Sequence, residues 1–115
     1  MHPMRVPGLW LFATATCLAA CKANAASFDC RSAMLPAEKA ICANANLSGL
    51  DERTAGMYFI IVGGGAPADI IAQVKDSQSK FVARRNACGA NLDCIVDAYT
   101  TQMMFLRNVK SNLGL

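Results

Sequence analysis

Cysteines are the residues of this 115-residue chain with the greatest capacity for chemistry, and four of them form two close pairs. Cys30 and Cys42 are 12 positions apart, and Cys88 and Cys94 are six positions apart. A free thiol can serve as a nucleophile or a metal ligand, whereas a thiol in a disulfide can do neither. Spacings of 12 and 6, without a C-x2-C pair, disfavour a zinc site and favour disulfides.

Histidine is absent after residue 2, which removes several kinds of catalytic and metal site. His2 is the only histidine, so Ser-His and Cys-His nucleophile pairs and the commonest metal ligand are excluded from the rest of the chain. No two carboxylates have a spacing that suggests an acid/base couple. We therefore expect a protein that is not an enzyme, with no catalytic residue, no metal and no cofactor.

The N-terminal segment has the pattern of a secretory signal. Arg5 precedes a mainly apolar run over residues 6–20, and residues 23–25 (Ala-Asn-Ala) fit the small-x-small pattern that a signal peptidase reads. The run is shorter than the ~20 residues that a membrane span needs. We therefore expect a signal peptide over residues 1–25 and one domain over residues 26–115.

A second cut is also consistent with the sequence. Residues 18–21 (Leu-Ala-Ala-Cys) match the bacterial lipobox, in which the cysteine becomes the acylated first residue of the mature protein. The alternative is therefore a signal over residues 1–20 and a lipid on Cys21. Either cut leaves the same four cysteines for pairing. The expected location is the periplasm or the exterior, or the membrane surface if Cys21 carries a lipid.

Length and charge narrow the partners that the domain can have. Removing 25 of 115 residues leaves 90, which is one small domain whose core alone supplies marginal stability. Arg5 and Lys22 lie in the leader and all the acidic residues lie beyond it, so nine basic and eight acidic residues give a net charge of +1. No basic cluster is interleaved with aromatic residues, so we expect a protein partner and no nucleic acid.

Proline, glycine and asparagine divide the domain into four predicted helices, at residues 36–43, 48–62, 67–88 and 91–110. Prolines suit the first positions of the first and third helices. A turn at residues 44–46 and a capping box at Ser48 and Asp51 start the second helix, and three glycines end it. Asn91 caps the fourth. The predicted fold class is all-α, a small disulfide-stapled helical bundle or hairpin with two long antiparallel helices.

Apolar residues at helical spacing predict the buried faces. The expected stripes contain Leu47, Leu50, Met57, Tyr58 and Ile61 in the second helix, Ile70, Val74, Phe81 and Val82 in the third, and Leu92, Ile95, Val96, Tyr99, Met103, Leu106 and Val109 in the fourth. Phe28, before the first helix, is expected to pack onto the core.

Four cysteines allow three pairings, of which the predicted helices favour the one between neighbours. Cys88 ends the third helix and Cys94 lies in the first turn of the fourth, so a bridge there closes the corner between them. Cys42, in the last turn of the first helix, can reach back to Cys30. Each bridge is expected to contribute ~2.5–3 kcal/mol by constraining the unfolded chain.

With this framework, the domain resembles the LprI-like lysozyme-inhibitor domain family of bacterial envelope proteins. The matching stretches are F-D-C at residues 28–30, E-K-x-I-C at residues 38–42 and R-N-x-C-x5-C at residues 85–94. The single residues that carry the match, with roles expected to be structural, are Phe28, Asp29, Glu38, Ile41, Asp51, Tyr58, Gln78, Phe81, Arg85, Asn86 and Tyr99. The family usually has Trp where this chain has Phe81.

The resemblance implies an exported, helical, disulfide-linked domain that binds and blocks lysozyme or a related wall hydrolase. The alternative is a general periplasmic interaction module with no hydrolase target. The loop of Gly63, Gly64 and Gly65 is a candidate binding loop for the first hypothesis, and residues 103–105 (Met-Met-Phe) are an apolar patch for the second. The acidic residues, Asp51 among them, are typical of solvated helix faces. Arg85 and Gln78 are expected to point inward, Arg85 for example to backbone carbonyls at the disulfide corner.

Overall fold

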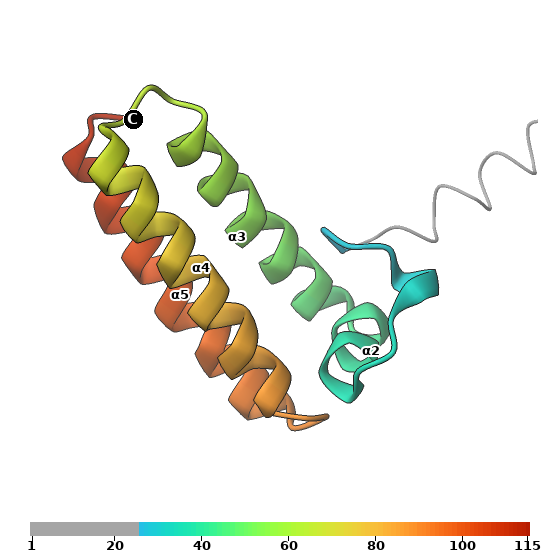
Figure 1. Cartoon of the computed structure of the whole chain (residues 1–115). Helices are drawn as coiled ribbons and strands as arrows, with labels where there is room; N and C mark the ends of the chain where they lie inside the picture. The colour runs from blue at the N-terminus through green and yellow to red at the C-terminus, as the bar shows by residue number, and fades with distance from the viewer. Residues whose placement is uncertain (1–25) are drawn as a thin grey trace, which may run out of the picture.

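The computed structural model describes residues 26–115 and is all-helical over that range (Figure 1). Its elements are a short 3-10 turn, η2 (Cys30–Ser32), and four helices, α2 (Pro36–Ala43), α3 (Ala45–Val62), α4 (Ala68–Ala87) and α5 (Leu92–Asn112). The predicted fold class is therefore confirmed. The predicted signal peptide and the lipidation of Cys21 lie outside the described residues.

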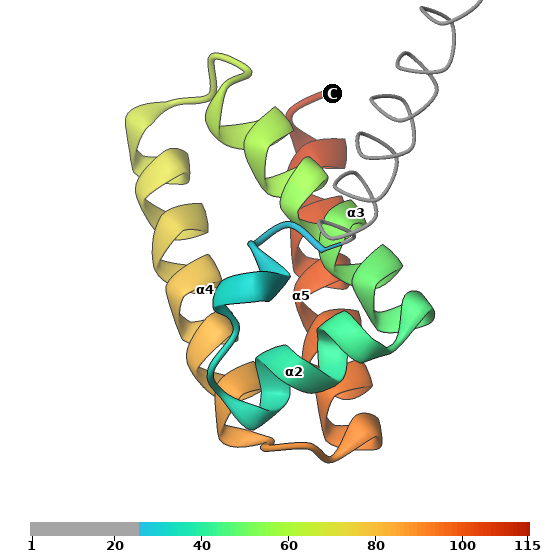
Figure 2. The ribbon, with the colours of Figure 1, turned by 90° about the vertical axis from the view of Figure 1, so that its right-hand side faces the viewer.

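Three helices run side by side along the length of the domain, and the fourth crosses one end. The chain passes up α3, down α4 and up α5, so α4 and α5 are the predicted antiparallel pair and α3 is a third long helix beside them (Figure 1). The short α2 lies across the end at which the α4–α5 turn lies and packs against α3 and α4 (Figure 2). We call this the α2 end, and the opposite end, with the α3–α4 loop, the glycine end.

Both predicted disulfides form, and both lie at the α2 end. The Cys30–Cys42 bridge joins the 3-10 turn to the last turn of α2, with 5.8 Å between the two Cα atoms. The Cys88–Cys94 bridge joins the end of α4 to the first turn of α5, with a Cα–Cα distance of 5.6 Å. The N-terminal arm, residues 26–35, is thereby fixed to the bundle.

The start of α3 differs from the prediction. The helix begins at Ala45, because the side chain of Asn44 accepts a hydrogen bond from the backbone N–H of Leu47 at 3.1 Å and caps it. Ser48 was expected to cap a later start. It is instead buried inside the helix, where its hydroxyl donates to the backbone carbonyl of Ile41 at 2.7 Å. The predicted turn at residues 44–46 therefore reduces to a single non-helical residue.

The other helix ends follow the local signals. The side chain of Asn91 accepts from the backbone N–H of Cys94 at 3.0 Å and caps α5 as predicted. Gly65 and Gly89 adopt positive φ angles of 78° and 60°, which glycine tolerates best, and they turn the chain after α3 and α4. Leu35 precedes α2 without a side-chain cap, as its apolar side chain requires.

The core consists of two clusters, one at each end of the bundle. The cluster at the α2 end comprises Ala26, Ala37, Ile41, Leu47, Phe81, Ile95, Ala98 and Tyr99, with Phe28 packed against it as predicted. The cluster at the glycine end comprises Ile61, Val74 and Leu106. No helix among residues 26–115 is long and apolar enough to cross a membrane.

Of the expected α5 stripe, two residues are exposed and two, Met103 and Val109, are half-buried. Leu92 and Val96 are exposed, whereas Ala98 and Gln102 are buried in their place. The buried face of α5 therefore follows residues 95, 98, 99, 102 and 106, which is the 3.6-residue period without the flanking apolar positions. The prediction was wrong there because it favoured large apolar residues near the stripe and left out the small Ala98 and the polar Gln102.

Candidate functional site

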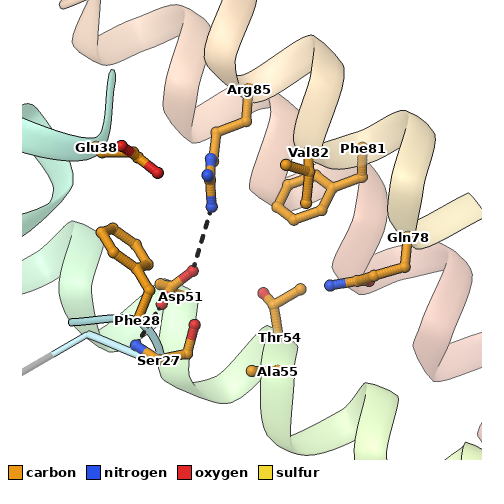
Figure 3. Close-up of a pocket in the computed structure, with 10 residues that line it drawn as sticks. All are labelled: Ser27, Phe28, Glu38, Asp51, Thr54, Ala55, Gln78, Phe81, Val82 and Arg85. Carbon is orange, nitrogen blue, oxygen red and sulfur yellow. Dashed lines mark hydrogen bonds and ion pairs between the residues drawn. The ribbon is translucent and has the colours of Figure 1, made fainter. Parts of the chain in front are cut away.

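A pocket opens between the N-terminal arm and the long helices α3 and α4, with a volume of about 230 Å³ (Figure 3). Its lining residues are Ser27, Phe28, Glu38, Asp51, Thr54, Ala55, Gln78, Phe81, Val82 and Arg85. Six of these were singled out by the sequence resemblance. The structure therefore gathers six of the motif residues, which are scattered over 58 positions from residue 28 to residue 85, around one hollow.

A buried ion pair forms one wall of the pocket. Asp51 and Arg85 are only 4% and 6% exposed, and Oδ1 of Asp51 lies 3.7 Å from Nη1 of Arg85. The Tyr99 hydroxyl joins the two, since it accepts from Nη1 of Arg85 at 3.4 Å and donates to Oδ1 of Asp51 at 2.7 Å. Asp51 was expected on a solvated face, and that expectation was wrong because its partners come from helices distant in sequence.

The same network fixes the N-terminal arm. Oδ2 of Asp51 accepts a hydrogen bond from the backbone N–H of Ser27 at 2.6 Å. The guanidinium carbon of Arg85 lies 5.4 Å from the centre of the Phe28 ring, within the range of a cation–π contact. One ion pair thus anchors two consecutive residues of the arm, which precede the Cys30–Cys42 bridge in the chain.

Arg85 has side-chain partners in place of the expected backbone carbonyls. Its Nε and Nη2 both donate to Oδ1 of Asn86, at 3.1 and 2.9 Å. With Nη1 bonded to Tyr99, three of the five guanidinium N–H groups have partners. Arg85 is therefore buried, as an inward orientation requires, and Asn86 orients it.

The hydroxyl of Tyr99 stays protonated over a wide pH range. Burial, followed by the hydrogen bond to Asp51, raises the pKa of Tyr99 well above its ordinary value of 10.0. The phenol therefore acts as a donor to the carboxylate. Its hydrogen bond stabilises the negative charge of Asp51, and a protonated phenol cannot act as a general base.

A chain of amides orients the opposite wall. The Ser77 hydroxyl donates to Oε1 of Gln102 at 3.2 Å, and Nε2 of Gln102 donates to Oε1 of Gln78 at 3.1 Å. This relay leaves the NH2 group of Gln78 pointing into the pocket toward Thr54 (Figure 3). The Thr54 hydroxyl donates to the backbone carbonyl of Leu50 at 2.7 Å, so only its lone pairs are available to a ligand.

Glu38 closes the pocket on the α2 side. Glu38 lies in the first turn of α2, and its Oε1 accepts hydrogen bonds from the backbone N–H groups of Met34 and Leu35, just before the helix, both at 3.2 Å. This agrees with the expectation of a charge at the helix start. The Glu38 side chain thus both holds the backbone before α2 and lines the pocket.

The remaining predicted site residues lie outside the pocket. Asp29 is exposed, accepts from the backbone N–H of Arg31 at 3.0 Å and pairs with its guanidinium at 3.1 Å, which lowers the pKa of Asp29. Ile41 is in the core, and Tyr58 is half-buried at the glycine end. The candidate loop of Gly63, Gly64 and Gly65 is exposed at that end. No group of three potential metal ligands occurs among residues 26–115.

Sequence reasoning missed three polar residues that complete the site. Thr54 and Gln102 are almost fully buried, and Ser77 is half-buried. A signal was present, since Thr54 lies three residues after Asp51 and Gln102 three residues after Tyr99, on the same helix faces. A polar residue in the middle of an apolar stripe indicates a buried hydrogen-bond network when a second helix has the same pattern.

Comparison with known proteins gives no assignment: no family model matches the chain, and neither the curated proteins nor the solved structures contain a match. The geometry itself therefore carries the functional argument. Both oxygens of Asp51 accept hydrogen bonds, and Tyr99 and Arg85 are held by partners. This arrangement suits a rigid wall that holds a ligand.

Proposed function

We propose that this chain is an exported binding protein of the bacterial cell envelope that binds and blocks lysozyme or a related wall hydrolase, without enzyme activity of its own. The proposal includes membership of the LprI-like family, removal of a signal peptide, and a place in the periplasm, outside the cell or, through Cys21, on a membrane. The observation that carries it is a rigid loop that displays an apolar side chain.

That loop joins η2 to α2. Met34 is 81% exposed, the most exposed of the large apolar side chains in the described part of the chain, and Leu35 beside it is 43% exposed. The Cys30–Cys42 bridge closes the segment, and Glu38 holds the backbone N–H groups of both residues. An apolar side chain on a fixed backbone loses little conformational freedom on binding, so the loop suits insertion into the cleft of a hydrolase.

The charge of the domain predicts how the complex responds to salt. At a net charge of +1 the domain has no overall acidic field to attract a basic lysozyme. Affinity would then come from apolar burial, which salt weakens little. We expect retention on a lysozyme column to persist when the ionic strength is raised.

The test is retention of the processed protein on immobilised lysozyme, with inhibition of wall hydrolysis measured in parallel. Met34→Ser should reduce retention and inhibition by about tenfold or more, because it removes the anchor. Met104→Ser is the matched control, since Met104 is 59% exposed on α5, and it should leave both unchanged. Absence of retention at low salt, or equal effects of the two variants, would contradict the proposal.

The alternative, a general interaction module, has a different surface in its favour. Of the apolar patch expected at residues 103–105, only Met104 is exposed, and Phe105 packs against the core of the glycine end. Phe59 and Ile60 on α3 are 65% and 49% exposed, however. Loss of binding to a partner other than a hydrolase on Phe59→Ser, with Met34→Ser neutral, would favour this alternative.

A further inference from the structure

The pocket at the α2 end is a candidate ligand site that the proposed binding of lysozyme through Met34 does not use. Its volume of about 230 Å³ lies below the ~300–1,000 Å³ typical of pockets for drug-sized ligands, so it fits a single ring or a short chain. It is open to solvent between the arm and the helices, and its side chains are fixed before any ligand arrives. The groups left available on its walls indicate the class of ligand.

The walls of the pocket offer both hydrogen-bond donors and hydrogen-bond acceptors to a ligand. The donors are the NH2 group of Gln78 and the N–H groups of Arg85 that make no hydrogen bond within residues 26–115, although Nη1 of Arg85 also lies 3.7 Å from Asp51. The acceptors are Oε2 of Glu38 and the lone pairs of Thr54. Donors on α4 thus face acceptors on α2 and α3 across the hollow (Figure 3). A ligand that satisfies both must itself carry donors and acceptors on opposite edges.

The charge of the lining favours an uncharged ligand. The ion pair of Asp51 and Arg85 leaves Glu38 as the one carboxylate without a cationic partner in the lining, so the formal sum is −1. An anion would face Glu38 and Asp51. A cation would face the guanidinium of Arg85 and the NH2 group of Gln78. Either ion loses water on entry without a complementary partner at both walls, which is costly.

The apolar part of the lining indicates that the ligand also has an apolar face. Phe28, Phe81, Val82 and Ala55 contribute side chains between the polar groups, and the rings of Phe28 and Phe81 come from the arm and from α4. A ligand of matching chemistry has an apolar C–H face and an edge of hydroxyl or amide groups. A saccharide ring has both.

We propose that this pocket binds a single neutral sugar ring, such as the terminal unit of a glycan, with Gln78 and Arg85 donating to its oxygens and Glu38 and Thr54 accepting from its hydroxyls. For a ligand of about 15 heavy atoms we expect weak binding, with a dissociation constant on the order of 1 mM. Glu38 supports both the pocket and the Met34 loop, but the sugar and the lysozyme would contact different side chains, Gln78 and Met34, so each proposal can fail without the other.

The experiment is an NMR titration of the processed, disulfide-bonded protein with N-acetylglucosamine and, separately, with glucose, acetate and lysine amide as probes. Saturable shifts confined to the arm, α2, α3 and α4 on addition of a sugar support the proposal. Shifts with N-acetylglucosamine but not with glucose would show that the pocket recognises the amide of the sugar. Shifts with both sugars would show that it recognises the ring hydroxyls. No saturable shift with either sugar, or shifts with acetate or lysine amide only, would overturn it.

A pair of variants on one helix separates recognition from folding. Gln78→Glu keeps the oxygen that accepts from Gln102 and removes the NH2 group, so sugar affinity should fall about tenfold or more with the thermal midpoint little changed. Gln73→Glu makes the same change in charge at an exposed position of α4 outside the pocket and should leave affinity unchanged. Equal losses in the two variants would also overturn the proposal.

Discussion

The two ends of the bundle use different means to hold the same three helices together. The α2 end has both disulfides, the ion pair of Asp51 and Arg85, and the pocket. The glycine end has an apolar cluster around Ile61, Val74 and Leu106, and no bridge. Apolar burial is enough to join helices, so the covalent and polar interactions at the other end point to a requirement for fixed geometry, as a binding surface needs.

The largest effect is expected from breaking the ion pair. Asp51→Ala leaves Arg85 buried without its carboxylate and frees the N–H of Ser27, so unfolding free energy should fall by about 3–5 kcal/mol in urea titrations. Asp76→Ala is the control, because the pair of Asp76 and Lys80 is 2.9 Å apart but largely exposed. It should change stability by less than about 1 kcal/mol. Similar losses of stability in both variants would contradict the claim that the buried ion pair at the α2 end stabilises the fold more than an exposed pair.

Removal of the arm bridge is expected to have the second largest effect. The variant with Cys30→Ala and Cys42→Ala should lose about 3 kcal/mol, because the unfolded chain regains the freedom of the closed loop. Hydrogen exchange should accelerate in α2 and the arm, while amides around Ile61 and Leu106 keep their relative protection. Uniform acceleration along the whole chain would mean that the two ends unfold as one unit.

The Tyr99 hydroxyl predicts a dependence on alkaline pH. Because its folded pKa is raised above 10.0, unfolded chains lose this proton near pH 10 while folded chains keep it. The contribution to stability is thus present below pH 10 and is lost as pH rises above it. Tyr99→Phe should remove this slope and cost about 1–3 kcal/mol at neutral pH, since Asp51 loses a donor. Denaturant midpoints from pH 7 to 11 measure both, and an unchanged slope would contradict the prediction.

The smallest effects are expected at glycines along α3 and its loop. Gly56 lies in the middle of the helix, and a methyl group there meets no atom within 4 Å, so Gly56→Ala should stabilise by roughly 0.5–1 kcal/mol. Gly65→Ala also meets no atom, but its φ of +78° strains an alanine and should destabilise by about 1–2 kcal/mol. Thermal midpoints that shift in the same direction for both variants would contradict this contrast.

The sequence predicted most of what depends on near neighbours in the chain. Prolines, glycines and Asn91 located helix ends, and the positions of Cys88 and Cys94 at a helix corner led to the correct pairing. The hydrogen bond between Tyr99 and Asp51 joins residues 48 positions apart, and no local pattern encodes it. Asp51 was therefore assigned to solvent, although Arg85 and Gln78 were expected to point inward, because a buried carboxylate is recognisable only once its partners are placed.

The site at which a signal peptide is removed would decide whether the nitrogen of Ala26 carries a charge near Asp51. Ala26 is buried, and the next backbone N–H, that of Ser27, lies 2.6 Å from Asp51. Cleavage after Ala25 would turn the nitrogen of Ala26 from a neutral amide into an ammonium ion. The next residue, Ser27, is the one whose N–H is bonded to the buried carboxylate of Asp51. Cleavage before Cys21 would leave an amide there. If the chain is processed, the two cuts would thus leave a different number of charges beside the buried ion pair of Asp51 and Arg85.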